Sequence, residues 1–209
     1  MAYGFLDIAA TPAVKAAQAA NGSLGFWQGF TGDRASDRFT PAEADFIARR
    51  DSFYMATVSE TGWPYVQHRG GPVGFLRVLN DRTLGFADFS GNRQYLSLGN
   101  LATKDRAALF LMDYPARRRL KILAHVEVRD LSDDPALAEA LALPGYKAKV
   151  ERAMLLHLEA FDWNCPQHIT PRFTQIEIAQ AVAPLHERIA ALEAENIALR
   201  AQLDDGATT

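Results

Sequence analysis

The chain has 209 residues, 48% of them hydrophobic, which permits one domain with a sizeable core and terminal additions, or at most two small domains. Its formal net charge of −3 does not indicate a nucleic-acid or membrane surface, and no stretch approaches the ~18 apolar residues that span a bilayer. The single cysteine excludes a disulfide within the chain, and no secretory leader pattern opens it, so we expect a cytoplasmic protein without nucleic-acid or membrane partners.

Residues 1–39 are predicted to form an N-terminal helical arm. The pair Thr11-Pro12 can cap and begin a helix, and Asn21-Gly22 can end it. The stretch from 23 to 39 carries glycines and bulky aromatic residues, so we interpret it as an irregular segment packed on a larger body.

Residues 40–175 are predicted to form the main domain. Thr40, Pro41 and Glu43 make a capping box that begins a short helix ending near Arg50. Runs of strand-forming residues then recur at 52–59, 64–69, 75–79, 83–88, 107–112, 120–128 and 152–161, interrupted by helical insertions near 92–101 and 135–143. Short strands joined by tight turns indicate a mainly-β antiparallel barrel of six or so strands with helical additions.

Residues 176–209 are predicted to form a C-terminal helix and a disordered tail. From 184 to 203 the sequence has helical period: Leu185, Leu192 and Leu199 share one heptad position, and Ile189, Asn196 and Leu203 share the other. A lone Asn at such a position fixes the register of paired helices, but a run of under three heptads is marginal alone. Pairing across a dimer and packing on the chain's own barrel both remain open.

The residues most indicative of chemistry lie where two strands end. Residues 64–72 end a strand in a glycine-rich loop, and residues 86–94 end another strand and open a helix. Gly91 permits close approach of the backbone to a ligand, and the N–H groups at the start of a helix bind anions. Ser90 and Asn92 add neutral donors, and Arg93 adds a planar guanidinium suited to phosphate. An ordinary turn at Gly91-Asn92 is the alternative.

Arginines and a lysine open the strand at 117–121. Alternation places Arg119 and Lys121 on one face, so these two could converge with Arg69 and Arg93 on a phosphate monoester. A solvated, arginine-rich turn is the alternative reading for 117–118. The chain has no Walker A motif and no G-x-G-x-x-G after a strand, which argues against a Rossmann nucleotide fold.

Four motifs in this order resemble the pyridoxamine 5′-phosphate oxidase-like flavin-binding family: QHRGGP (67–72), FADFSGNRQYLSLGNL (86–101), FLMDYPARRRLKI (110–122) and DWNCPQHI (162–169). The resemblance covers most of residues 40–175. It implies a six-stranded split barrel, a homodimer, and one FMN in each of two clefts at the dimer interface.

The resemblance also implies which residues bind FMN. It places Gln67, His68 and Arg69 at the strand end beside the cofactor, and Phe86, Ala87, Asp88 and Phe89 along the flavin. It assigns Ser90, Asn92 and Arg93 to the phosphate, Arg119 and Lys121 to the lining of the cleft, and Asn164, Gln167 and His168, beside Trp163, to the partner subunit's cover over the ring. For His68, alternation leaves open a surface position, and Trp163 could equally be buried in a core.

An FMN-dependent oxidoreductase that passes electrons between a nicotinamide cofactor and a small redox partner is the expected function; a non-catalytic flavin- or haem-binding carrier or sensor is the alternative. No catalytic residue is identified. The true oxidase has a lysine shortly after its strand arginine and a C-terminal Arg/His motif, whereas this chain has Gly74 and its neighbours and a heptad helix, so vitamin B6 oxidation is not expected. Cys165, His157 and His168 lack a second ligand pair, so no metal site is expected.

Overall fold

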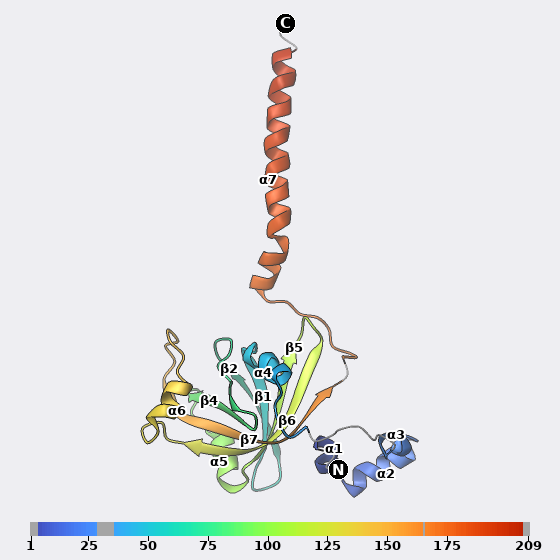
Figure 1. Ribbon diagram of the computed structural model, residues 1–209, viewed down its shortest axis with the longest axis vertical. Coiled ribbons are helices and arrows are strands. Elements are labelled where there is room, and N and C mark those ends of the chain that lie inside the picture. The colour runs from blue at the N-terminus through green and yellow to red at the C-terminus, as the bar shows by residue number, and fades with distance from the viewer. Residues whose placement is uncertain (1–3, 29–35, 165, 207–209) are drawn as a thin grey trace. The chain divides into compact units, whose positions relative to one another are not determined.

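The computed structural model describes residues 4–28, 36–164 and 166–206 (Figure 1). Contacts divide the chain into two compact units, one made of Met1–Asp113 and Arg117–His168, the other of Tyr114–Ala116 and Ile169–Thr209. The predicted division into an arm, a barrel and a C-terminal segment stays a prediction. Among the described residues, no helix has the length and apolarity needed to cross a membrane.

Three short helices open the first unit: α1 (Phe5–Ala9), α2 (Pro12–Ala20) and α3 (Leu24–Gln28). Thr11 is the N-cap of α2, where its side chain accepts a hydrogen bond from the Val14 N–H, and Asn21 is the C-cap. The predicted start and end of this helix are therefore confirmed. Part of the irregular segment predicted after it, 29–35, lies outside the described residues.

Helix α4 (Pro41–Ala48) has the predicted capping box. The Thr40 side chain accepts from the first turn, and the Glu43 carboxylate accepts from the Thr40 N–H at 3.0 Å. Phe46 and Ile47 are fully buried and anchor the helix on the core. The N-terminal signal read from the sequence thus begins a helix whose apolar face is used for packing.

The main body of the first unit is a seven-stranded antiparallel sheet that curves around a shared interior (Figure 1). Its strands are β1 (Ser52–Val58), β2 (Pro64–Gly70), β3 (Arg77–Asn80), β4 (Thr83–Phe89), β5 (Arg106–Asp113), β6 (Arg118–Arg129) and β7 (Val150–Asn164). They follow the order β2-β1-β5-β6-β7-β4-β3. The prediction of a mainly-β antiparallel domain with helical additions is confirmed.

The predicted count of six strands in a split barrel is wrong in detail. All seven runs of strand-forming residues became strands, and the sheet is open because β2 and β3 form its two edges. The additional strand is β3, which has only four residues and pairs with β4 through an irregular register. Both the reading of the strand runs and the family resemblance gave about six strands, although the residues carried seven strand signals.

An aromatic cluster lies at the centre of the core. Phe53 stacks on Phe75 at 5.7 Å between ring centroids and meets Phe86 edge to face at 5.4 Å. All three side chains are buried, and each contributes on the order of 1.5–3 kcal/mol through removal of apolar surface from water. This packing fixes β1, β4 and the loop before β3, which together border the candidate site. The helices α5 (Leu96–Thr103) and α6 (Pro135–Ala140) complete the unit.

The second unit contains one long helix, α7 (Gln175–Gly206). It begins at a capping box in which the Thr174 hydroxyl accepts from the Glu177 N–H and the Glu177 carboxylate accepts from the Thr174 N–H, at 3.2 and 2.7 Å. The C-terminal helix was predicted within 176–209, with helical period recognised only from 184; in the structure the helix already begins at Gln175 and Pro184 lies inside it. The T-x-x-E signal upstream was missed.

Candidate functional site

Strand β2 presents polar side chains on one face. Tyr65, Gln67 and Arg69 are partly buried, while the intervening Val66 and His68 are exposed. The Tyr65 hydroxyl donates to the Gln67 amide oxygen. Strand alternation predicted that His68 would face away from Gln67 and Arg69, and the burial pattern confirms it. The His68 ring instead meets the edge of Tyr54 at 5.5 Å.

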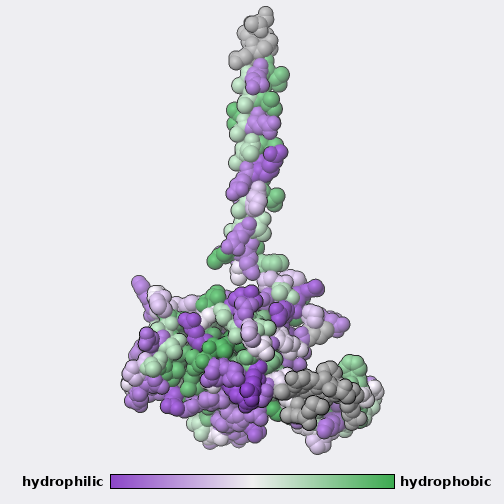
Figure 2. All heavy atoms as spheres, viewed as in Figure 1, coloured by the Kyte–Doolittle hydropathy of each residue, from purple (hydrophilic) through white to green (hydrophobic). Residues whose placement is uncertain are grey.

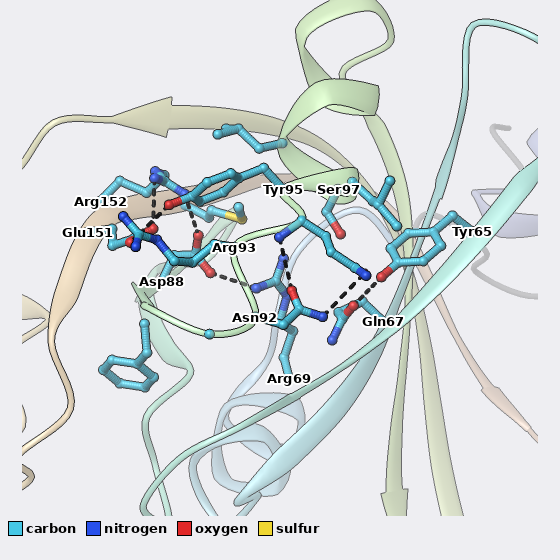
Figure 3. A pocket seen from close by; sticks show the side chains of 16 residues that line it. Tyr65, Gln67, Arg69, Asp88, Asn92, Arg93, Tyr95, Ser97, Glu151 and Arg152 are labelled. Atoms are coloured by element: carbon cyan, nitrogen blue, oxygen red, sulfur yellow. Dashed lines mark hydrogen bonds and ion pairs between the residues drawn. The ribbon is translucent and has the colours of Figure 1, made fainter.

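A buried carboxylate joins two arginines beside this face. Asp88, only 5% exposed, accepts from Arg69 Nη1 at 2.6 Å through Oδ1 and from Arg152 Nη1 at 3.1 Å through Oδ2 (Figure 3). The register of β4 and β7 produces the second contact, because Asp88 and Arg152 are opposite each other. Asp88 was expected to lie along a flavin; its side chain is used to hold two guanidinium groups in place.

The same network secures the start of α5. Arg152 also pairs with Glu151 at 2.9 Å and lies over the ring of Tyr95, whose hydroxyl donates to Glu151 at 3.2 Å. Burial works against ionisation of Glu151, but hydrogen bonds from Ser90, Tyr95 and Arg152 lower the pKa of its carboxyl. Tyr95 is the N-cap of α5 and has a left-handed backbone, φ 53°. The network therefore fixes the turn from which α5 begins.

Two polar atoms beside this network lack a partner. Arg69 Nε and Ser97 Oγ are buried, and no group of the described residues hydrogen-bonds either one. Both residues line a cavity of about 190 Å³ whose other lining residues include Gln67, Asp88, Arg93, Tyr95 and Arg152 (Figure 3). Leaving a buried donor or hydroxyl unpaired costs about 1–3 kcal/mol, so these atoms point to a polar ligand in the cavity.

The loop before α5 supplies further donors to this cavity. Asn92 Oδ1 accepts from the Gln94 N–H at 3.1 Å, which closes a turn, and Arg93 follows with φ 62°. Arg93 is exposed at the cavity and forms no ion pair with any described residue. Gly91 lines the cavity too, and a Cβ there would meet nothing within 4 Å. The chain's own packing therefore leaves open space at Gly91.

The helix N-terminus at α5 faces the same cavity. Gly99 N–H bonds back to the Tyr95 carbonyl at 2.8 Å, so the N–H groups that precede it in the first turn lack an intrahelical acceptor. These belong to Leu96, Ser97 and Leu98, which all line the cavity. Free N–H groups and the helix dipole favour an anion there.

A second cavity of about 170 Å³ adjoins the first. Both are lined by Gln67, Arg69, Asp88, Phe89 and Gly91. The second adds His68, Phe75, Phe86 and Ala87. The predicted residues of β2 and β4 therefore do come together around two contiguous hollows. In the glycine-rich loop that follows β2, a Cβ on Gly71 would lie 2.8 Å from the Phe75 ring, so core packing explains that glycine.

Arg119, Lys121 and Asn164 do not reach these cavities within one chain. They lie near the far ends of β6 and β7, where Arg119 pairs with Asn164 and Lys121 with Asp162 in the register. Arg119 donates to the Asn164 amide oxygen, and Lys121 Nζ lies 2.7 Å from Asp162. One chain therefore gathers Arg69 and Arg93, but not all four of the cations whose convergence was anticipated.

Some residues of the 162–169 motif are packed against their own chain, and others are exposed. The Trp163 indole donates to Glu43 at 2.7 Å and meets Phe46 at 4.8 Å, so its own chain uses this ring. Gln167 and His168 are exposed. Cys165 lies outside the described residues, and no group of three or more His, Cys, Asp and Glu among those described could hold a metal ion.

The first cavity is also lined by residues that sequence reasoning missed, among them Tyr65, Tyr95, Ser97, Glu151 and Arg152. Tyr95 and Ser97 lie in the 86–101 motif, two and four positions after Arg93, so their place in the motif could have identified them as site residues. Glu151 and Arg152 come from the start of a strand 58 or more residues further along the chain, and only the pairing of β4 with β7 brings them here.

Comparison with known proteins gives one family and several solved structures. The family model described as pyridoxamine 5′-phosphate oxidase matches residues 39–159, more than half of the chain. HupZ from Group A Streptococcus is similar at 14% identity, over 65% of this chain and 99% of that one, with a TM-score of 0.46. A pyridoxamine 5′-phosphate oxidase-related FMN-binding protein from Nostoc punctiforme is similar at 16% identity, over 60% and 84%, with a TM-score of 0.42. No curated protein matches the chain.

Proposed function

Because the chain belongs to the pyridoxamine 5′-phosphate oxidase family, we propose that it is an FMN-binding oxidoreductase that passes electrons between a nicotinamide cofactor and a small acceptor. The observation that carries this proposal is the pair of unpartnered buried atoms, Arg69 Nε and Ser97 Oγ, in a cavity that also holds an unpaired arginine and a helix N-terminus. That donor set suits a phosphomonoester.

The phosphate fits the first cavity by charge and by hydrogen bonding. Three arginines and two carboxylates line the cavity, so its formal charge is positive and Arg93 has no anionic partner of its own among the described residues. Ser97 Oγ and Arg69 Nε would gain the acceptors they lack, and the first N–H groups of α5 would gain an anion. Asn92 adds a further neutral side chain to this lining, whereas the Ser90 hydroxyl already donates to Glu151.

The second cavity is proposed to hold the planar part of the cofactor. Its lining combines Gln67 and His68 with Ala87, Phe89 and the buried residues Phe75 and Phe86. FMN supplies the electron-transfer chemistry when bound. The protein's contribution is then to orient the ring, to exclude water on the Phe75 and Phe86 side, and to set polarity through Gln67 and His68.

A homodimer is proposed to complete the site. None of Arg119, Lys121, Asn164, Gln167 and His168 lines either of the two cavities of its own chain, so we assign them to the flavin of a second subunit. The outer face of β1 and β2 exposes Tyr54, Val58 and Val66, an apolar surface of the kind that a two-fold interface buries. We leave Trp163 out of this role, because its indole already donates to Glu43 and its ring meets Phe46.

FMN titration of the purified protein tests the phosphate site. We expect Arg93→Ala to weaken FMN binding by about 10- to 100-fold, the loss of one charge-assisted contact, while riboflavin binding changes little. Arg106→Ala, an exposed arginine outside both cavities, is the matched control. Equal affinities of wild type and Arg93→Ala for FMN would overturn the assignment of the phosphate.

Anaerobic reduction tests the proposed activity. The FMN-loaded protein should lose its flavin absorbance when NADH or NADPH is added, and regain it when a small acceptor follows. A yellow protein that neither nicotinamide reduces would favour the carrier or sensor function. Uptake of haem instead of FMN would contradict the flavin proposal itself.

A further inference from the structure

A continuous apolar stripe runs along α7. Taking Leu185, Leu192 and Leu199 as d positions extends the pattern upstream to Ile178, and it makes Val182, Ile189, Asn196 and Leu203 the a positions. The pattern therefore begins before Pro184 and covers more heptads than the 184–203 stretch alone. Pro184 falls at position c, on the outer side of the helix, where it does not interrupt the a/d seam.

This stripe is exposed to an unusual degree. Its leucines and isoleucines are 45–73% exposed, and hydrophobic residues recur among hydrophilic ones along the coloured part of α7 (Figure 2). Most stability of a long protein helix comes from packing of its apolar face, not from intrinsic propensity. The stripe consequently requires a partner surface.

We propose that α7 pairs with α7 of a second copy of this chain as a parallel, in-register, two-stranded coiled coil. The choice of residues at a and d supports two strands: β-branched Val182 and Ile189 occupy a positions, and Leu occupies three d positions, the combination that favours parallel dimers. Asn196 is the single polar residue in the seam. In a parallel pair in register it faces its own copy, which lets the two amides hydrogen-bond and penalises other registers.

The charges that flank the seam match the same pairing. With this heptad assignment, Arg188 and Glu195 are g residues, and Glu193 and Arg200 are e residues. A parallel dimer brings each g residue beside the e residue five positions later on the other helix. That gives Arg188 with Glu193 and Glu195 with Arg200, which are opposite charges in both cases.

Contacts within one helix do not explain three of these charges, Arg188, Glu193 and Glu195. Residues five apart on one helix do not face each other, and neither Arg188 nor Glu193 has an opposite charge three or four positions away. None of the four takes part in an ion pair in the described part of the chain. A second copy of α7 supplies the missing partners.

The pairing is independent of the flavin. A parallel coiled coil has its two-fold axis along the supercoil, which is compatible with any two-fold arrangement of the first units but does not require one. Loss of FMN binding therefore leaves this inference intact, and separate helices would leave the FMN proposal intact.

Disulfide formation in the full-length chain tests the register and direction. In a Cys165→Ser background, Leu199→Cys places a thiol at d, where the two copies are adjacent, and Ala201→Cys places it at f, on the outer surface. Under mild oxidation, we expect covalent dimer to form at least ten-fold faster with Leu199→Cys, at a helix content by circular dichroism equal in both variants. Equal rates, or faster formation at 201, would overturn the proposal and indicate antiparallel pairing or packing on the chain's own first unit.

A charge swap tests the flanking pairs. In the Leu199→Cys background, Arg188→Glu should slow covalent dimer formation by about three-fold, because it sets like charges against Glu193 of the other copy. The double variant Arg188→Glu with Glu193→Arg restores the opposite signs and should recover the original rate. A double variant as slow as the single one would contradict the parallel register.

Discussion

The two ends of β7 carry charged residues in similar numbers, but the chain satisfies them to different degrees. At the start of the strand, Arg152 shares the buried Asp88 with Arg69, and Arg69 still has an unpartnered Nε facing a cavity. At the other end, Lys121 pairs with Asp162 and Arg119 with Asn164, and no buried atom there lacks a partner among the described residues. The two ends are separated by roughly 40 Å of strand.

This difference shows that clustering of cations does not by itself identify a ligand site. In the sequence, the two regions look the same, because each has basic residues close to the end of a strand. Only the first end has donors whose hydrogen-bonding capacity the chain leaves unused, and an unused buried donor has a cost that a ligand can remove. Substitutions at the two ends should therefore differ in size and kind.

The largest contrast is expected between two aspartates. Asp88→Ala leaves two largely buried guanidinium groups without their shared carboxylate, so the free energy of unfolding should fall by about 3–5 kcal/mol. Asp162→Ala removes the partner of a Lys121 that is 28% exposed, and should cost no more than about 1 kcal/mol. Urea unfolding of the apo proteins, followed by tryptophan fluorescence, measures both.

Asp88→Asn serves as the matched control for this contrast. It keeps the size of the side chain and one acceptor oxygen, and so should recover part of the lost stability. If Asp88→Ala and Asp162→Ala were equally mild, the network at the cavity would be solvent-screened, and its role in positioning Arg69 and Arg152 would fail.

The next effect concerns the packed end of β7. Trp163→Phe keeps an aromatic ring against Phe46 but removes the indole donor to Glu43, so it should lower the free energy of unfolding by about 1–3 kcal/mol at neutral pH. FMN affinity should be unchanged, because Trp163 belongs to its own chain's core. If Trp163→Phe bound FMN more weakly but had the stability of wild type, Trp163 would belong to the flavin site instead.

The pH dependence of this effect follows from Glu43. Burial opposes ionisation of Glu43, but hydrogen bonds from Thr40 and Trp163 lower the pKa of its carboxyl below the usual value. A lowered pKa gives stability that is present above the unfolded value of about 4.3 and disappears as the pH falls through the folded value. The difference between wild type and Trp163→Phe should therefore be constant from pH 8 to 5 and shrink below pH 4.

Local signals in the sequence predicted much of the fold. The caps at Thr11 and Thr40 act through neighbouring backbone groups, and the strand runs through alternation, so both are legible from a few consecutive residues. The start of α7 is equally evident from the capping box of Thr174 and Glu177, which the prediction did not use. Whether the sheet closes into a barrel could not be predicted, because this depends on which strands lie at its edges.

The candidate site was predicted only in part for a related reason. Gln67, Arg69, Asp88 and Arg93 lie in two short motifs and do line the cavities. The partner of Asp88 was missed because Arg152 comes from a distant strand whose register the sequence does not state. Conversely, Arg119 and Lys121 share the residue types of a phosphate site, but their strand pairing places them with Asn164 and Asp162.

The smallest effects are expected for Ser97→Ala, which should raise the stability of the apo protein while it lowers the affinity for FMN. The opposite signs separate a structural role of the hydroxyl from a role in ligand binding. Ser97 is 4% exposed and its hydroxyl has no partner, so Ser97→Ala removes an unsatisfied polar group and should raise the apo protein's free energy of unfolding by up to about 1 kcal/mol. Higher helix propensity of Ala adds a few tenths in the same direction. FMN affinity should nevertheless fall by roughly 2- to 12-fold, one hydrogen bond, so saturating FMN should raise the melting temperature of the variant by less than it raises that of wild type. A hydroxyl with only a structural role would change the stability alone, so a variant that is less stable but unaltered in FMN affinity would show that Ser97 faces no ligand.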